Sequence, residues 1–385
     1  MVEEKDLTIM KYIRTYETEE KFLTDKDSTS RGFRLKPTLY KYSETGDHVH
    51  LELDDPRKHG DSTYIEITLD SDVEFSFYIS NKTGDTQTTM TCTIDWGDGT
   101  VETKTITAEV AEDDPIGNKR FKLSHNYKAG SYKIELYDVE REYGVIGGLY
   151  ETVSLISPIN SVKRVVLSNS VVSMIYDTFA GCTSLTSVHI PERVTTYIGS
   201  FANCTSLTSI NIPEGVTSIN DTTFYGCTSL TSINIPESVV EIRYGAFANC
   251  TSLTSVYIPK NVNSIGEGAF ANCTSLTSIN IPEGVTGISS WVFSDCTSLT
   301  SINIPEKVTH IDEEAFARCS SLKSISSFNT KAPSLSLSGA DTDGNPVGVF
   351  DQLPTDGTLH VKPGATGYDA WLSKLPSGWT IVEDL

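Results

Sequence analysis

The sequence has no long apolar run and no basic segment. No stretch approaches the roughly 18–20 apolar residues of a membrane-spanning helix, so we expect no membrane span. The chain carries 51 acidic and 30 basic residues, a formal net charge of -21. A chain this acidic is not expected to bind nucleic acid or an anionic membrane surface. We interpret the acidity mainly as a source of solubility.

A secretory signal is also missing from the N-terminus. Met1 is followed by Val-Glu-Glu-Lys-Asp, which lacks the basic and then apolar pattern of such signals. Two interpretations stay open. Either a signal has been removed from an exported protein, or the protein reaches its place by another route, as a virion protein would.

Motifs of catalysis are absent as well. The chain has no nucleophile elbow, zinc-protease, P-loop or dinucleotide fingerprint. Its seven histidines are scattered, and only His48 and His50 alternate as neighbours on one strand face would. A metal site there would need a third ligand. We therefore expect a protein that is not an enzyme and that needs no cofactor.

Cysteines are present, but their spacing does not suit disulfides. Seven of the eight follow one another at an interval of 22 and then five intervals of 23 residues. They occupy the same position in successive repeats: Cys182, Cys204, Cys227, Cys250, Cys273, Cys296 and Cys319. Such a column predicts a ladder of buried thiols that behave as small apolar side chains.

The repeat around each cysteine is the strongest signal in the chain. Its unit reads roughly F-x-x-C-T-S-L-T-S-I-N-I-P-E-x-V-T-x-I. The L-x-x-I-x-I segment places three side chains inward on a short strand, and the proline that follows ends the strand because it has no N–H to donate. The later V-x-x-I pair and the Phe-x-x-Cys pair complete the interior. One unit cannot bury this set alone, so the units must stack into a solenoid.

Polar residues of the L-x-x-I-x-I segment point outward and form columns along the predicted strand face. Seven rungs at about 4.8 Å make a polar sheet roughly 30 Å long. Such solenoid faces are the usual ligand surfaces, although Thr and Ser also serve simply as soluble strand residues. The candidate ligand-binding residues are Thr186, His189, Thr208, Asn211, Thr231, Asn234, Thr254, Tyr257, Thr277, Asn280, Thr300 and Asn303. His189 and Tyr257 interrupt the Asn column and are the strongest candidates for specific contacts.

The N-terminal third has a different pattern. Strand-like alternation recurs between residues 60 and 140, for example in Tyr64-Ile-Glu-Ile-Thr-Leu and Tyr132-Lys-Ile-Glu-Leu, with turn signals between the runs. This is typical of a β-sandwich. We divide the chain into a strand-rich segment of unassigned role (1–58), a sandwich (59–142), a connector (143–160), the repeats (161–328) and a C-terminal cap (329–385).

Asp95 and Asp98, with the nearby Asp113-Asp114, are weak candidates for a calcium loop. The alternative is that Trp96 is a core residue and that Gly97-Asp-Gly is a tight turn in which Asp98 bonds its own backbone. We expect His125 to pack or hydrogen-bond within the sandwich.

The unit F-x-N-C-T-S-L-T-S-I-x-I-P-E-x-V-T-S-I closely resembles the BspA-type leucine-rich repeats of bacterial surface proteins, over residues 162–325. The C-terminal T-L-H-V-K-P-G and W-T-I-V-E also look like the endings of many such proteins. Residues 60–140 resemble a PKD-type immunoglobulin-like domain, through Trp96-Gly-Asp-Gly-Thr, His125-Asn-Tyr127 and Gly130-Ser-Tyr-Lys-Ile. The resemblances imply a mostly β protein: an immunoglobulin-like sandwich followed by a right-handed leucine-rich-repeat solenoid with units of about 23 residues and a C-terminal cap.

The function implied is adhesion or recognition at a cell surface, with a protein or glycan of a host, matrix or neighbouring cell as partner. We expect an extracellular or cell-surface monomer. A structural or virion-associated assembly protein and an accessory binding module of a polysaccharide-utilising system remain as alternatives.

Overall fold

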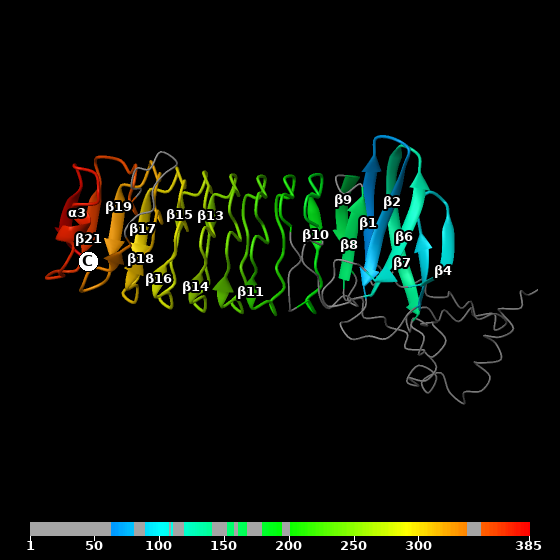
Figure 1. Cartoon of the computed structure of the whole chain (residues 1–385), viewed down its shortest axis with the longest axis horizontal. Coiled ribbons are helices and arrows are strands. Elements are labelled where there is room, and N and C mark those ends of the chain that lie inside the picture. Colours follow the sequence, from blue (N-terminus) through cyan, green and yellow to red (C-terminus); the bar gives the residue numbers. More distant parts are fainter. Residues whose placement is uncertain are drawn as a thin grey trace, which may run out of the picture.

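The structure is a computed structural model of the chain, and it is long and narrow (Figure 1). It describes residues 63–80, 89–107, 109–110, 119–140, 152–157, 161–167, 179–194, 201–336 and 348–385. A two-sheet sandwich lies at one end and helix α3 (Asp369–Leu372) at the other, with a solenoid between them. The N-terminal segment 1–58, which the sequence left without a role, lies outside the described residues.

Two sheets of mostly antiparallel strands form the sandwich. The first has the order β10-β9-β1-β7-β3-β4 and the second the order β5-β6-β2-β8. Alternation along β1 buries Ile65, Ile67 and Leu69, and the core also takes Phe75 from β2 and Phe121 from β6. The strands predicted between residues 60 and 140 are thus present. Their bounds are β1 (Thr63–Leu69), β2 (Val73–Ser80), β3 (Thr89–Asp95), β4 (Val101–Thr107), β5 (Glu109–Val110), β6 (Lys119–Tyr127) and β7 (Gly130–Glu140).

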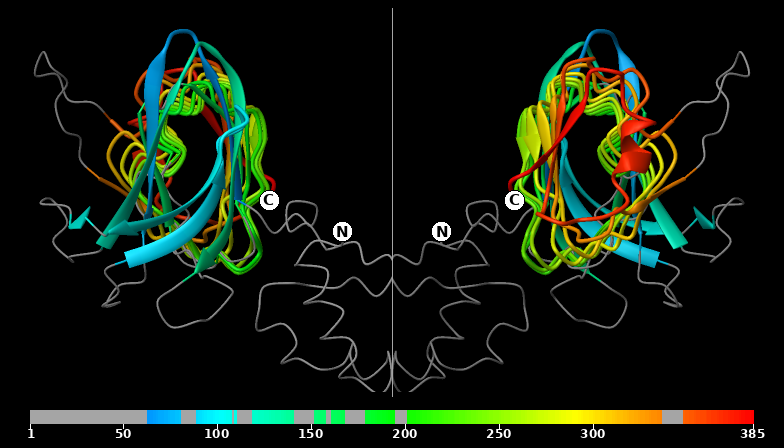
Figure 2. Two further views of the ribbon diagram at one scale, coloured as in Figure 1. Left: turned by 90° about the vertical axis from the view of Figure 1, so that its right-hand side faces the viewer. Right: turned by 90° about the vertical axis from the view of Figure 1, so that its left-hand side faces the viewer.

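The sandwich and the solenoid share one sheet. Strand β9 (Val162–Val166) pairs antiparallel with β1 and parallel with β10 (Ser187–His189), which belongs to the next repeat. Strand β8 (Thr152–Ser157) lies inside the segment that we interpreted as a connector, yet it pairs with β2. The glycines before it hid this strand in the sequence. The two parts are therefore joined by backbone hydrogen bonds. Viewed along the long axis of the molecule, the sandwich overlaps the turns of the solenoid (Figure 2).

Two columns of short parallel strands build the solenoid, as the repeat predicts. The first column follows the L-x-x-I-x-I segments with β10, β13 (Ser255–Val256), β15 (Ser278–Ile279), β17 (Ser301–Ile304) and β19 (Ser324–Ser327), and β21 (Thr358–Val361) and β22 (Thr380–Glu383) continue it. The second follows the V-x-x-I pairs: β11 (Ser218–Ile219), β12 (Glu241–Ile242), β14 (Ser264–Ile265), β16 (Gly287–Ile288), β18 (His310–Ile311) and β20 (Ser334–Leu335). Equivalent residues pair directly, as Ile302 does with Ile325.

Phenylalanine rings stack along the interior. From Phe179 to Phe316, consecutive rings are nearly parallel and their centroids lie 5.2–5.9 Å apart. Each cysteine lies beside this stack, and all seven cysteines of the repeats are free and buried, which confirms the predicted ladder. The structure adds a hydrogen bond: each thiol from Cys204 to Cys319 donates to the carbonyl oxygen of a phenylalanine in the preceding repeat, at 3.1–3.2 Å.

The residue before each cysteine adopts a left-handed backbone, which explains the recurrence of Asn and Gly there. The φ angle is 60° at Asn203, 70° at Gly226 and 61° at Asn249. Glycine and asparagine tolerate this region far better than other residues. At Gly226 a β-carbon would also lie 2.5 Å from Oδ1 of Asn203. Asp295 and Arg318 have the same φ of 61° at this position, so the stacked repeats also impose the turn where the residue is neither Asn nor Gly.

The C-terminal segment continues the solenoid before it closes it. Phe350 stacks on Phe316 with ring centroids 6.2 Å apart, and the buried Leu353 takes the place of the cysteine. Strands β21 and β22 extend the first strand column. The buried Trp371 of α3 then covers Phe350, with ring centroids 5.4 Å apart. Residues 348–385 thus add further turns to the solenoid and cover its last ring.

Candidate functional site

The strand face consists of polar columns on the outer side of the first strand column. The Thr residues that we proposed as ligand contacts are exposed in every rung from Thr186 to Thr300. Asn211, Asn234 and Asn303 are exposed too, and Asn211 and Tyr257 both form parallel bridges with Asn234. The predicted candidates therefore lie together on one surface. The bonds that they make decide which of them are free for a ligand.

The Thr column is occupied in holding the rungs together. The hydroxyl of Thr186 donates to the Lys163 carbonyl at 3.0 Å, and that of Thr277 to the Thr254 carbonyl at 3.1 Å. The hydroxyls of Thr231 and Thr254 make the same bond at 3.4 Å. These hydroxyl protons are therefore not available as donors to a ligand, although the oxygen atoms can still accept.

Asn280 is likewise committed to the fold. Its Nδ2 donates to the Ile258 carbonyl at 2.7 Å, and its Oδ1 accepts the Ile258 backbone N–H at 2.8 Å. These two hydrogen bonds hold two successive repeats together next to Tyr257. Among the proposed ligand contacts, Asn280 therefore has a structural role.

Tyr257 and His189 are the two aromatic side chains among the proposed contacts of the strand face; His360 of β21 continues the same column, but its Nδ1 lies 2.9 Å from Asp384 Oδ1. Tyr257 is 62% exposed, more than any other large apolar side chain of the described residues. His189 is exposed on β10, beside the junction with the sandwich, and its carbonyl accepts the Leu167 N–H at 3.1 Å. A ring that lies in solvent at the position of an asparagine adds nothing to the interior. These two side chains remain the strongest contact candidates.

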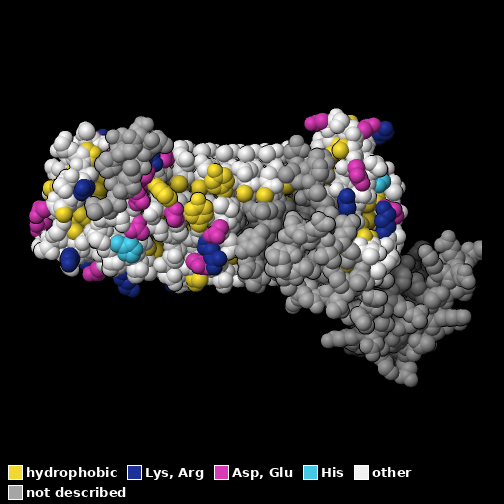
Figure 3. Space-filling model, in the orientation of Figure 1, with side chains coloured by type: hydrophobic (Ala, Val, Ile, Leu, Met, Phe, Trp, Pro, Cys, Tyr) yellow, Lys and Arg dark blue, Asp and Glu magenta, His cyan; other side chains and the backbone are white. Residues whose placement is uncertain are grey.

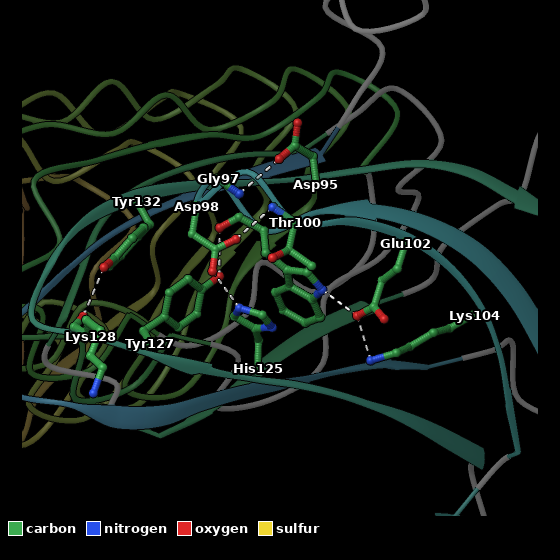
Figure 4. A network of polar contacts seen from close by, with 11 residues as sticks. Asp95, Gly97, Asp98, Thr100, Glu102, Lys104, His125, Tyr127, Lys128 and Tyr132 are labelled. Atoms are coloured by element: carbon green, nitrogen blue, oxygen red, sulfur yellow. Dashed lines mark hydrogen bonds and ion pairs between the residues drawn. The ribbon is translucent and has the colours of Figure 1, made fainter.

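The second candidate region is the turn between β3 and β4, shown in Figure 4. Trp96 is fully buried, its ring stacks on that of His125 with centroids 4.9 Å apart, and its Nε1 donates to Glu102 at 2.6 Å. The hydroxyl of Tyr127 donates to the Trp96 carbonyl at 2.9 Å. The indole therefore anchors the turn within the sandwich, as the alternative interpretation of this motif predicted.

The carboxylates of this turn are already in use. Asp98 accepts the Thr100 N–H through Oδ1 at 2.9 Å, and its Oδ2 lies 2.8 Å from His125 Nε2. Partial burial would raise the pKa of Asp98, but the bonds from His125 and Thr100 outweigh it and hold that pKa below its usual value. Asp95 accepts the Gly97 N–H at 2.9 Å. The turn is stabilised by its own backbone and histidine.

Metal binding finds no further support in the described part of the chain. No group of three His, Cys, Asp or Glu side chains comes together among those residues. The calcium candidates Asp95 and Asp98 therefore lack a third ligand there. Asp113, Asp114, His48 and His50 lie outside the described residues.

Comparison with known families identifies the solenoid. Residues 157–250 and 196–323 match the profile described as the BspA type leucine rich repeat region, in six copies. The repeats of this chain belong to the BspA-type leucine-rich-repeat family. The matched residues span the Phe stack, the Cys ladder and both strand columns, so the resemblance seen in the sequence is confirmed for this region. The PKD-type assignment of the sandwich stays a prediction.

Several solved structures resemble the BspA-type repeats. A leucine-rich repeat protein from Bacteroides ovatus is 27% identical, over 60% of this chain and 58% of that one, with a TM-score of 0.47. The T. pallidum leucine rich repeat protein is 31% identical, over 45% and 84%, with a TM-score of 0.41. A leucine rich cell surface protein from Faecalibacterium prausnitzii is 24% identical, over 45% and 75%, with a TM-score of 0.21. The chain thus spans less than two thirds of the Bacteroides protein. None of the curated proteins matches it.

No helix among the described residues is both long and apolar enough to pass through a bilayer.

The BspA-type solenoid carries exposed aromatic side chains that the sequence did not lead us to select. Tyr225, Tyr244 and Trp291 are exposed in the turns that follow the second strand column, Tyr244 and Trp291 before the Phe of their repeat and Tyr225 directly after it. The signal that could have found them is the one used for Tyr257: each departs from the residue that other repeats have in its place.

Proposed function

We propose that this chain is a non-enzymatic recognition or adhesion protein of the cell surface, which binds a host, matrix, cell or glycan ligand through the strand face. The observation that carries the proposal is the exposed, nearly uncharged strand face, about 30 Å long, which leaves Tyr257 and His189 in solvent. Solenoids commonly present their ligand surfaces in this way. The BspA-type repeats and the extended shape favour the same conclusion.

The chemistry of the strand face favours hydrogen bonding with a polar ligand. Ser and Asn side chains alternate with Thr oxygens whose protons are engaged elsewhere. A tyrosine adds large contact area at a low cost in conformational entropy, which is why it is common at recognition surfaces. A ligand centred on Tyr257 would therefore combine one aromatic contact with several polar ones.

The test uses variants that restore the repeat consensus. Tyr257→Asn and His189→Asn introduce the residue found at the same position in neighbouring repeats, so both should fold. The full chain would be assayed against glycan arrays, immobilised matrix proteins and whole cells. We expect binding that Tyr257→Asn weakens at least tenfold, with no change in melting temperature.

The matched control is His310→Ser, which changes an exposed histidine of the second strand column to the serine of other repeats. It should leave binding unchanged. If the two strand-face variants bind as well as the parent while His310→Ser does not, the ligand surface has been placed on the wrong side. Defined trimers or fibres in light scattering would instead favour the assembly function.

A further inference from the structure

A second surface of the solenoid carries exposed aromatic side chains, which we call the aromatic flank: Tyr225, Tyr244 and Trp291. Their exposed fractions are 39%, 56% and 38%. They follow the second strand of their repeats, whereas the proline of the repeat precedes that strand. Figure 3 shows hydrophobic side chains spread along this face of the solenoid, with charged side chains among them. The aromatic flank is therefore distinct from the strand face.

Comparison among the repeats shows that these aromatic residues are not needed for the fold. Trp291 occupies the position that is Gly245 and Gly268 in the two preceding repeats, and all three have a left-handed backbone, with φ of 55° at Trp291. Tyr225 occupies the position of Ala248, which is buried. A bulky residue in this backbone region costs on the order of 1–3 kcal/mol, and 38% of the Trp291 surface remains exposed to solvent. Thr222 and Glu314 have the same backbone at this position, so the exposed indole, and not the φ angle, distinguishes Trp291 from the other repeats.

The surroundings of the aromatic flank are polar and acidic. Asp221 and Glu267 are exposed at the positions equivalent to Tyr244, and Asp221 accepts the Tyr244 N–H at 3.1 Å. Glu241 is held by Arg243 at 2.6–2.8 Å. The aromatic rings are thus interspersed with carboxylates and do not form one continuous apolar patch.

We propose that the aromatic flank binds a neutral polysaccharide chain. The flat faces of sugar rings stack on exposed aromatic rings, and the carboxylates between them accept hydrogen bonds from sugar hydroxyls. The spacing of the repeats suits such a ligand. Trp291 lies two repeats after Tyr244, and the Phe rings of these three repeats are 5.2 and 5.9 Å apart. The distance between successive sugar rings in an extended polysaccharide is similar to the distance between successive repeats. The acidic surroundings and the net charge of -21 disfavour anionic polysaccharides.

The experiment is affinity electrophoresis of the full chain in gels that contain xyloglucan, galactomannan or hydroxyethylcellulose, with polygalacturonate as the anionic comparison. We expect retardation by at least one neutral polymer and none by polygalacturonate. Trp291→Gly restores the residue of the neighbouring repeats, so it removes the indole without adding strain. It should weaken retardation at least tenfold and leave the melting temperature unchanged or raised.

Two further variants separate this proposal from the strand-face function. Tyr244→Glu, which copies the residue at position 267, should weaken retardation as Trp291→Gly does, whereas Tyr257→Asn should not. Retardation lost in Tyr257→Asn alone would overturn the aromatic flank while supporting the strand face. Absence of retardation by every neutral polymer, or retardation that Trp291→Gly leaves intact, would also overturn it, whatever the strand face binds.

Discussion

The sandwich and the solenoid bury similar side chains but specify their structures differently. In the solenoid, Phe247 contacts the same residue type on both sides, with ring centroids 5.3 and 5.2 Å away, so each turn is defined by its immediate neighbours. In the sandwich, Trp96 meets Glu102 of β4 and His125 and Tyr127 of β6, and this set of contacts has no copy elsewhere. A repeated core can therefore tolerate a local change that a core of unique contacts cannot.

The stability of the solenoid and that of the sandwich should differ most at alkaline pH. Burial raises the pKa of Cys182, Cys227, Cys273 and Cys319 to about 12, and the sandwich has only one such thiol, Cys92. The folded state therefore keeps these protons above the pKa of about 8.5 that a thiol has in the unfolded chain. This contribution to stability is complete below that pH and is lost as the pH rises towards 12. Each thiol then costs roughly 1.4 kcal/mol per pH unit.

Since a domain has about 5–15 kcal/mol of stability, the seven thiols of the repeats should unfold the solenoid near pH 10, before the sandwich. Hydrogen exchange measured by mass spectrometry at pH 8 to 10.5 resolves the two regions. A double variant, Cys227→Ser and Cys250→Ser, keeps a donor for each Phe carbonyl and should shift the transition to higher pH. Unfolding of both regions at one pH, unaffected by the double variant, would contradict the mechanism.

Large-to-small changes in the two cores should cost similar free energies but differ in extent. Phe247→Ala and Trp96→Ala each remove a fully buried ring and should cost about 3–5 kcal/mol. Because each turn contacts only its neighbours, Phe247→Ala should increase hydrogen exchange mainly between residues 224 and 270. Trp96→Ala should increase it throughout the sandwich. If both variants increased hydrogen exchange equally across the whole molecule, the solenoid and the sandwich would not differ in how far a local change spreads.

How far the sequence could predict this structure follows the same division. Because the same pattern of buried positions recurs in every repeat, the residues of the Phe, Cys and strand columns could be predicted one by one. Strand β8 was not, since a single alternating run beside glycines carries no second copy to confirm it. Phe350 was hidden for another reason: it follows Phe316 by 34 residues, so the period is interrupted even though the stack continues. In the strand face, uniform Thr and Asn columns predicted a surface but not its ligand.

A smaller effect should test the hydrogen bonds of the sandwich alone. Tyr127→Phe removes the hydroxyl that donates to the buried Trp96 carbonyl, while the ring stays against Tyr132. The expected loss is about 1–3 kcal/mol, measured by urea denaturation of the sandwich. Tyr132→Phe is the control, because its hydroxyl bonds the Lys128 carbonyl at an exposed site. It should lose much less, and an equal loss would mean that burial of the acceptor is not the deciding factor.

The smallest expected effect is a gain of stability within the repeats. Thr222 has a φ of 52° at the position held by Gly245 and Gly268, and a β-branched side chain is poorly suited to that region. Thr222→Gly should therefore stabilise the solenoid by about 1 kcal/mol, because the strain it removes outweighs the added freedom of the unfolded chain. The adjacent Thr223→Gly should have the opposite sign, since Thr223 is buried and its hydroxyl donates to the Asn220 carbonyl at 2.9 Å. Thermal melts of both variants measure this difference. A loss of stability in Thr222→Gly would show that the order of this turn, whose Thr222 N–H donates to the Tyr244 carbonyl of the next repeat at 2.8 Å, matters more than backbone strain. That outcome would extend the rule of neighbour contacts from the interior of the solenoid to its surface turns.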